Sequence, residues 1–217
     1  MNFRKYGIAA ALAFVPLVAG CSKTGDISTA GGVGITAIRT SCPEVAVPAG
    51  TGDITLFNPA TSQDASAIDV TATITDVRST CNDSGANVLT NITFNVEARR
   101  SKADGARDVT FPYFITVVRG GSAVTAKRIG HATVHFAAGQ LRAQVSAQGA
   151  TSINRAAATI PQDIRDKITQ KRKAGQADAA VDPLSEPDVQ QAIQRATFEA
   201  LVGFQLTEDQ LKYNATR

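Results

Sequence analysis

The sequence predicts a mainly β protein, an antiparallel β-sandwich of seven or eight strands followed by two or three helices. Apolar and polar residues alternate along most of residues 38–160, as expected of strands that bury one face. Turn residues, chiefly glycine, separate these alternating runs. After residue 160 the apolar spacing becomes that of a helix, which predicts a helical C-terminal region at residues 161–217.

The first twenty-one residues form a leader that differs from the rest of the chain. Two basic residues, Arg4 and Lys5, precede an apolar run that is interrupted by Pro16 and is too short to span a bilayer as a helix. The run ends in Leu17-Val18-Ala19-Gly20-Cys21. This ending resembles the lipobox of bacterial lipoproteins, in which signal peptidase II cuts just before an acylated cysteine.

The resemblance to lipoproteins implies a signal peptide at residues 1–20 and an anchor, made of acyl chains such as palmitate, on Cys21. In lipoproteins of this kind, an aspartate directly after the acylated cysteine favours retention in the inner membrane. Here the residue at that position is Ser22. The resemblance therefore implies a periplasm-facing anchor in the outer membrane. Residues 21–37 are rich in Gly, Ser, Thr and Ala, the composition of a flexible tether. Such a tether reaches roughly 20 Å, which keeps the domain close to its membrane.

Cys42 and Cys81 remain as an even pair once Cys21 carries lipid. Exported proteins occupy oxidising compartments, so we expect a disulfide between these two cysteines. The bond would close a loop of about 40 residues and stabilise the fold by roughly 4 kcal/mol in the loop-entropy model. A redox or metal-binding role is disfavoured because the pair lacks a Cys-x-x-Cys spacing.

The alternation and the turns predict the strands one by one. Asp104-Gly105 and Gly120-Gly121 predict hairpins on the two sides of one long strand, and Gly139 predicts a further turn. The architecture resembles that of immunoglobulin and fibronectin type III domains, although the chain has no tryptophan. Such sandwiches host many activities, so the fold names none. The expected strands are residues 45–47, 54–57, 68–75, 92–99, 109–117, a segment that ends at Phe136, and 141–148.

Three helices are expected after the strands. Pro161 suits a first helical turn, and Lys171-Arg172-Lys173 before Gly175 is typical of a helix end. Ser185 is expected to cap the second helix. Thr207 and Gln210 are expected to form the capping box of the third.

An apolar stripe is expected along the second helix, from Val189 to Val202. This apolar stripe is expected to pack against either the chain's own sandwich or a partner protein, and the sequence leaves both possibilities open. The candidate docking residues are Phe198, Leu201, Phe204, Leu206 and Leu211.

The sequence disfavours several functions. The formal net charge is +3, two of these charges lie in the leader, and no basic cluster suggests nucleic acid. We expect no cofactor and no metal, because His131 and His135 would lie roughly 13 Å apart along one strand. We expect no enzyme, because no serine lies in a Gly-x-Ser-x-Gly motif and no catalytic constellation is recognisable.

The sequence therefore favours a lipid-anchored periplasmic protein with a structural or assembly role. We expect it to contact the bilayer through acylated Cys21 and an envelope protein through a sheet edge or the helical region. The alternative is a module that binds peptidoglycan or another glycan. That alternative would need an exposed cluster that includes Tyr113 and Phe114.

Overall fold

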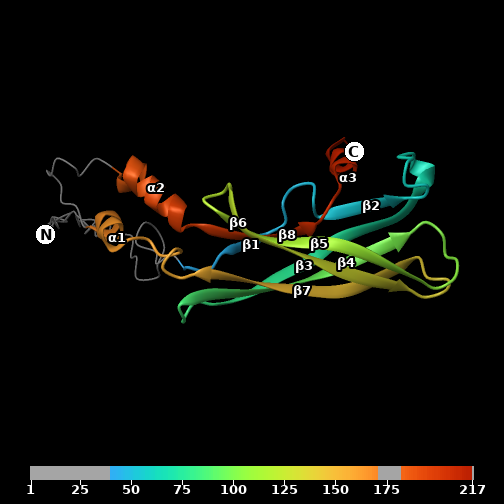
Figure 1. Ribbon diagram of the computed structural model, residues 1–217, viewed down its shortest axis with the longest axis horizontal. Coiled ribbons are helices and arrows are strands. Elements are labelled where there is room, and N and C mark those ends of the chain that lie inside the picture. The colour runs from blue at the N-terminus through green and yellow to red at the C-terminus, as the bar shows by residue number, and fades with distance from the viewer. Residues whose placement is uncertain (1–39, 171–181, 217) are drawn as a thin grey trace, which may run out of the picture. The chain divides into compact units, whose positions relative to one another are not determined.

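Two four-stranded sheets pack face to face and enclose the core (Figure 1). The computed structural model describes residues 40–170 and 182–216. Sheet A has the strand order β1-β8-β5-β6, and sheet B has the order β2-β3-β4-β7. Within the described residues every strand pair is antiparallel except β1 with β8. The predicted sandwich is confirmed.

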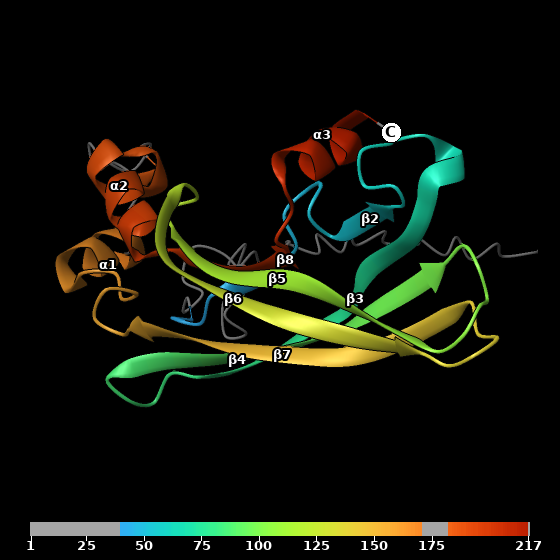
Figure 2. The ribbon, with the colours of Figure 1, turned by 45° about the vertical axis from the view of Figure 1, so that its right-hand side comes forward.

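The two sheets differ in how their strands follow along the chain. In sheet B, β2, β3 and β4 are consecutive neighbours, whereas β8 returns from the end of the chain into the middle of sheet A. In both views α1 and α2 lie at one end of the sandwich, and α3 lies beside β2 (Figures 1 and 2). The elements are β1 (Glu44–Ala46), β2 (Asp53–Phe57), β3 (Ile68–Asn82), β4 (Asn87–Arg100), β5 (Arg107–Arg119), β6 (Ala123–Phe136), β7 (Arg142–Asn154), β8 (Phe198–Phe204), α1 (Gln162–Thr169), α2 (Pro187–Ala196) and α3 (Glu208–Thr216), with short 3-10 turns at Ala65–Ala67 and Pro183–Ser185.

The alternation of apolar and polar residues in the sequence corresponds to an alternation of buried and exposed positions in the strands. Along β4 every second residue from Val88 to Arg100 is buried, and the residues between them are exposed or half-buried. Burying one large apolar side chain contributes roughly 1.5–3 kcal/mol, so the aromatic residues account for much of the core's stabilisation. The largest fully buried side chains include Phe94, Phe111, Phe136 and Phe204.

The prediction that the second helix continues to Val202 is wrong, because residues Phe198–Phe204 form strand β8. Helix α2 ends at Ala196, and β8 pairs with β1 on one side and with β5 on the other. A short, nearly continuous apolar run fits a buried helix and a central strand equally well, and here the position between two strands decides it. The sandwich therefore extends past residue 160, and Ile38–Arg217 form one compact unit.

The helix caps are predicted correctly in one case out of two. In α3, Gln210 Oε1 accepts from the Thr207 N–H at 2.9 Å and Thr207 Oγ1 accepts from the Gln210 N–H at 3.3 Å, which is the expected capping box. In α2 the cap is Glu186 and not Ser185, because Pro187 occupies the first helical position, where its missing N–H is harmless. The predicted basic end at Lys171-Arg172-Lys173 lies outside the described residues.

The turn at Asp104-Gly105 is not a hairpin. It carries the chain from β4 in sheet B to β5 in sheet A, and the turn that contains Gly139 carries it back from β6 to β7. Gly120-Gly121 does form the expected hairpin between β5 and β6, with φ values of +62° and +78° that favour glycine.

Both crossings are held by Arg100, the last residue of β4, which is only 3% exposed. Its guanidinium donates to the backbone carbonyls of Asp104 and Gly105 in the first crossing and of Ala137 and Gln140 in the second, at 2.6–3.0 Å. The positions of the two turns are thus coupled through one buried cation.

Candidate functional site

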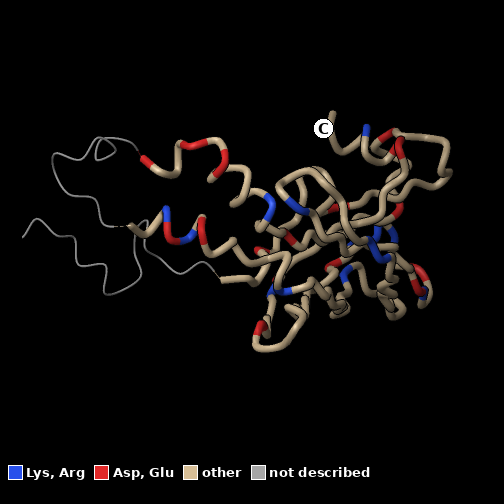
Figure 3. Tube along the Cα trace, turned by 60° about the vertical axis from the view of Figure 1, so that its left-hand side comes forward, with Lys and Arg blue, Asp and Glu red and all other residues tan. Residues whose placement is uncertain are grey.

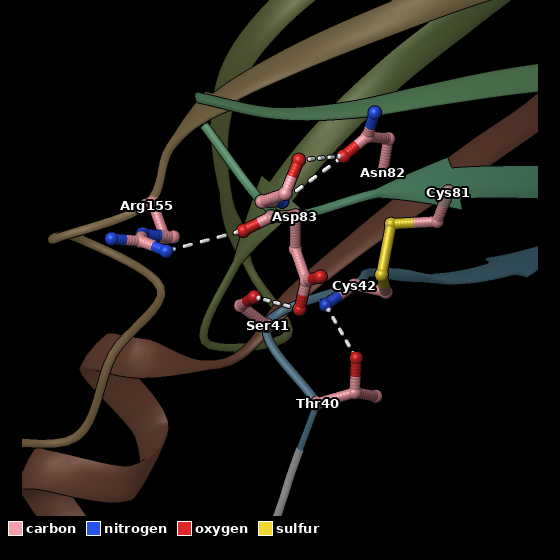
Figure 4. Close-up of a disulfide and its surroundings, with 8 residues drawn as sticks. Thr40, Ser41, Cys42, Cys81, Asn82, Asp83 and Arg155 are labelled. Carbon is pink, nitrogen blue, oxygen red and sulfur yellow. Dashed lines mark hydrogen bonds between the residues drawn. A yellow bond between two sulfur atoms is a disulfide. The ribbon is translucent and has the colours of Figure 1, made fainter. Parts of the chain in front are cut away.

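The described chain begins at the sandwich end that carries α1 and α2, where a disulfide joins Cys42 to Cys81 with a Cα–Cα distance of 6.1 Å (Figures 1 and 4). This bond confirms the predicted pairing. Next to it, Ser41 Oγ donates to the Asp83 carboxylate at 2.9 Å, and Arg155 donates to the Asp83 carbonyl at 3.4 Å. The segment that leads into β1 is therefore fastened to the end of β3 and to the turn that follows it.

The predicted lipid-bearing Cys21 lies outside the described residues, as do the signal peptide at residues 1–20 and the tether at residues 21–37. Among the helices that the structure describes, none has both the length and the apolar character needed to cross a membrane. Lipid attachment at Cys21 stays a prediction from the sequence.

The five candidate docking residues do not form one surface. Phe198 and Phe204 are buried in the sandwich, where the Phe204 ring packs 5.9 Å from that of Phe111. Leu201 and Leu206 are half-buried, and Leu211 on α3 is 46% exposed. For Phe198 and Phe204 the cover that the sequence left open is the sandwich itself, because β8 places both side chains in the core.

The aromatic cluster required by the glycan alternative is not exposed either. The Tyr113 hydroxyl donates to the Gln148 carbonyl at 2.9 Å, and its buried ring packs edge-on against Phe94. Phe114 is half-buried beneath the Lys127 ammonium, which lies 5.2 Å from the ring centre. Tyr113 thus bridges β5 to the backbone of β7 and links the two sheets.

The histidines lie on β6 but are not paired with each other. His135 Nδ1 contacts the Asp108 carboxylate at 2.6 Å, and His131 lies opposite Pro112 in the ladder. In the described part of the chain, no group of three His, Cys, Asp or Glu side chains is arranged to hold a metal ion.

Helices α1 and α2 carry charged residues of both signs (Figure 3). Lys167 on α1 forms ion pairs with Glu186 and with Asp188, the latter at 2.9 Å. Hydrogen bonds to Glu186 and Asp188 raise the pKa of Lys167, and the hydrogen bond from Lys167 lowers the pKa of Asp188. This contact joins the two helices but forms no single-sign patch.

The most exposed strand segment is the first half of β6, residues 123–129, which we call the β6 edge. All seven of its residues are exposed, including Val124 at 63% and Ile129 at 50%. In the described part of sheet A, β6 pairs only with β5, so its other side presents backbone N–H and C=O groups to solvent. Lys127 and Arg128 lie between the two apolar residues.

Beside the β6 edge, the outer face of sheet A carries half-buried apolar side chains. Ile129 lies directly opposite Phe114, and Phe114 lies opposite Gly203 of β8. The Phe114 ring leans over Gly203, because a Cβ at that glycine would lie 2.9 Å from Phe114 Cζ. Leu201 follows one row further along β8. Of the five predicted docking residues, Leu201 is the one that lies on this face.

The outer face of sheet B has a different character and was not singled out by the sequence reasoning. Two rows of side chains cross β3, β4 and β7, and between them lies a shallow, open depression of about 470 Å³. The sequence signal for this face is the set of polar residues in the alternating strands, but alternation alone predicts only that such residues face solvent. The polar residues of the depression are Thr71, Thr73, Glu97, Arg99, Arg142 and Gln144.

No family model, curated protein or solved structure matches this chain.

Proposed function

We propose that this protein is a lipid-anchored component of a bacterial cell envelope whose role is assembly, and that it binds another envelope protein through the β6 edge. The anchor is supported by the order of basic residues, apolar run and Cys21 at the start of the sequence. An oxidising location is supported by the Cys42–Cys81 disulfide, since such bonds persist mainly in exported proteins.

The single observation that carries the assembly role is the exposure of the β6 edge. Natural sandwiches normally shorten, cover or charge the edge strands of their sheets, because a free edge can pair with another chain. Here the edge strand is fourteen residues long, and although it carries Lys127 and Arg128, its first half also exposes the apolar side chains of Val124 and Ile129. An edge with exposed apolar side chains is the kind of surface that accepts an added strand from a partner.

The side chains of the β6 edge indicate the chemistry of that partner. Lys127 and Arg128 favour an extended segment that carries acidic residues, and they disfavour a second basic edge. Val124 and Ile129 favour apolar residues next to those acidic ones. The same two cations also oppose pairing between copies of this chain, which would bring like charges together.

The test is co-purification from gently solubilised native envelopes with the double variant Val124→Glu/Ile129→Glu. These substitutions place two negative charges on the edge without touching the core, so the fold is retained and a stoichiometric partner is lost. Leu89→Glu is the matched control, because Leu89 is 51% exposed on the other sheet. Cys21→Ser supplies the unanchored control, in which the partner is also expected to be lost.

Three results would contradict the proposal. The partner persists in the double variant, or the partner is a second copy of the same chain, or only glycan fragments are recovered. A photo-crosslinker at position 124 strengthens the test, since an adduct must then come from within reach of the β6 edge.

A further inference from the structure

Two arginines face each other on the outer face of sheet B. Arg99 of β4 lies directly opposite Arg142 of β7, and both are exposed. The Arg100 N–H donates to the Leu141 carbonyl at 3.0 Å, so the neighbouring Arg99–Arg142 pair is the non-hydrogen-bonded kind, in which opposite side chains are closest. Like charges in such a pair destabilise a sheet, so this arrangement carries a cost.

Two carboxylates on the same face, Asp69 and Glu97, bind other partners. Both terminal nitrogens of the Arg107 guanidinium donate hydrogen bonds to the Asp69 carboxylate, at 2.9 and 3.2 Å. Glu97 accepts from Thr75 at 3.0 Å, and Thr75 lies on the side of Glu97 that points away from Arg99. Among the described residues, Arg99 and Arg142 form no ion pair and no side-chain hydrogen bond.

The surroundings of the two guanidiniums combine polar side chains with Ala98, Ala143 and the carboxylate of Glu97. Thr71, Thr73 and Gln144 add hydroxyl and amide groups to the depression, and no aromatic side chain lines it. Protein interfaces are usually centred on buried aromatic or apolar side chains, so this face does not suit a protein partner. Hydroxyls and amides at regular strand spacing suit a ligand that is itself polyhydroxylated.

We propose that this depression binds an acidic polysaccharide. In this proposal the guanidiniums of Arg99 and Arg142 donate hydrogen bonds to a carboxylate of one sugar unit. Arginine donates in a planar fork that matches a carboxylate, and such charge-assisted pairs are among the stronger hydrogen bonds. Thr71, Thr73 and Gln144 then receive the neighbouring hydroxyls. This site lies on sheet B and is independent of the protein contact proposed for sheet A.

The test measures binding of polygalacturonate to the full-length protein, purified in detergent and immobilised through a C-terminal tag. We expect binding that weakens with added salt, and at least about tenfold weaker binding by Arg99→Gln/Arg142→Gln. The Arg99→Lys/Arg142→Lys variant keeps both charges without the fork and is expected to fall between. Arg165→Gln/Lys212→Gln removes the same charge from exposed positions of α1 and α3 and is expected to bind as the unaltered protein does.

Two comparison polymers decide between ligand classes. Methyl-esterified polygalacturonate presents the same sugars without the charge, and polyglutamate presents the charge without the sugars. Weak binding of both supports the proposal. Equal binding of polyglutamate would instead make this a surface for acidic polypeptide, and equal binding by the Arg99→Gln/Arg142→Gln variant would overturn the site itself.

Discussion

At the residue scale, Arg100 shows how a polar group organises this core. A buried cation is unfavourable unless its donors are satisfied, and here four backbone carbonyls satisfy them while the Phe136 ring lies 5.3 Å away. Those carbonyls belong to the two turns that cross between the sheets. The cost of burying the charge is therefore offset by contacts that exist only when both crossings are in place.

We expect Arg100→Met to lower the free energy of unfolding by about 3–5 kcal/mol, because it leaves buried carbonyls without donors at both crossings. Urea unfolding followed by circular dichroism measures this change. The neighbouring Arg99→Met, at an exposed position of the same strand, is expected to change stability by less than about 0.5 kcal/mol. Similar losses from the two variants would mean that the carbonyl contacts do not stabilise the crossings.

The strand expected from the sequence ends at residue 99, one residue before Arg100. In the structure Arg100 continues the buried alternation of Ile92, Phe94, Val96 and Ala98, so period two accounts for its direction but not for the groups that it contacts. Its acceptors lie in turns up to 40 residues away, and their approach depends on how the sheets are connected. Tyr113 is a similar case, because its bond to the Gln148 carbonyl links strands of different sheets.

At the element scale, local sequence signals predicted the elements that depend on neighbouring residues. They did not predict the elements whose structure depends on pairing between distant strands. The capping box of Thr207 and Gln210, the Gly120-Gly121 hairpin and the alternating strands were predictable for this reason. Strand β8 was not, because its place between β1 and β5 is a long-range property. The β6 edge was anticipated only as a sheet edge in general, since the sequence does not say which strand lies outermost.

Helix α1 depends on a contact that pH should control. It has no buried residue, so the ion pairs of Lys167 with Glu186 and Asp188 are expected to be its main attachment to α2. The pKa of Lys167 is raised, so the stabilisation that its ion pairs provide is fully present below pH 10.5, the ordinary pKa of lysine. This stabilisation is lost as the pH rises through the raised pKa. The pKa of Asp188 is lowered, so the stabilisation that its ion pair provides is fully present above pH 3.8, the ordinary pKa of aspartate. This stabilisation is lost as the pH falls through the lowered pKa.

We expect Lys167→Gln to detach α1 at neutral pH without unfolding the sheets, and unaltered α1 to detach on acidification below the pKa of Asp188. Heteronuclear NOE values of the α1 amides report the mobility of the helix, and circular dichroism reports the sheets. Lys212→Gln removes an exposed i,i+4 pair within α3 and serves as the control. An α1 that stays ordered in Lys167→Gln would show that other contacts hold it.

At the scale of the whole molecule, the two proposed binding surfaces lie on different sheets and the disulfide lies at one end. The β6 edge belongs to sheet A, and the Arg99–Arg142 pair belongs to sheet B. A variant at one surface is therefore a control for the other. The end that carries Cys42 is the end at which the described chain begins.

The disulfide is expected to matter most for the strand next to it. Strand β1 has three residues and, among the described residues, pairs only with β8. Val45 also packs against the core, and the Cys42–Cys81 bond and the Ser41–Asp83 hydrogen bond tie down the segment that leads into the strand. The bond joins residues 39 apart, and the loop-entropy model gives about 4 kcal/mol for its removal. We expect Cys42→Ser/Cys81→Ser to lose about this much in urea unfolding. Hydrogen exchange should then show β1 amides losing protection before those of β4; equal protection of both strands, or a loss below about 1 kcal/mol, would mean that pairing with β8 is sufficient to hold β1.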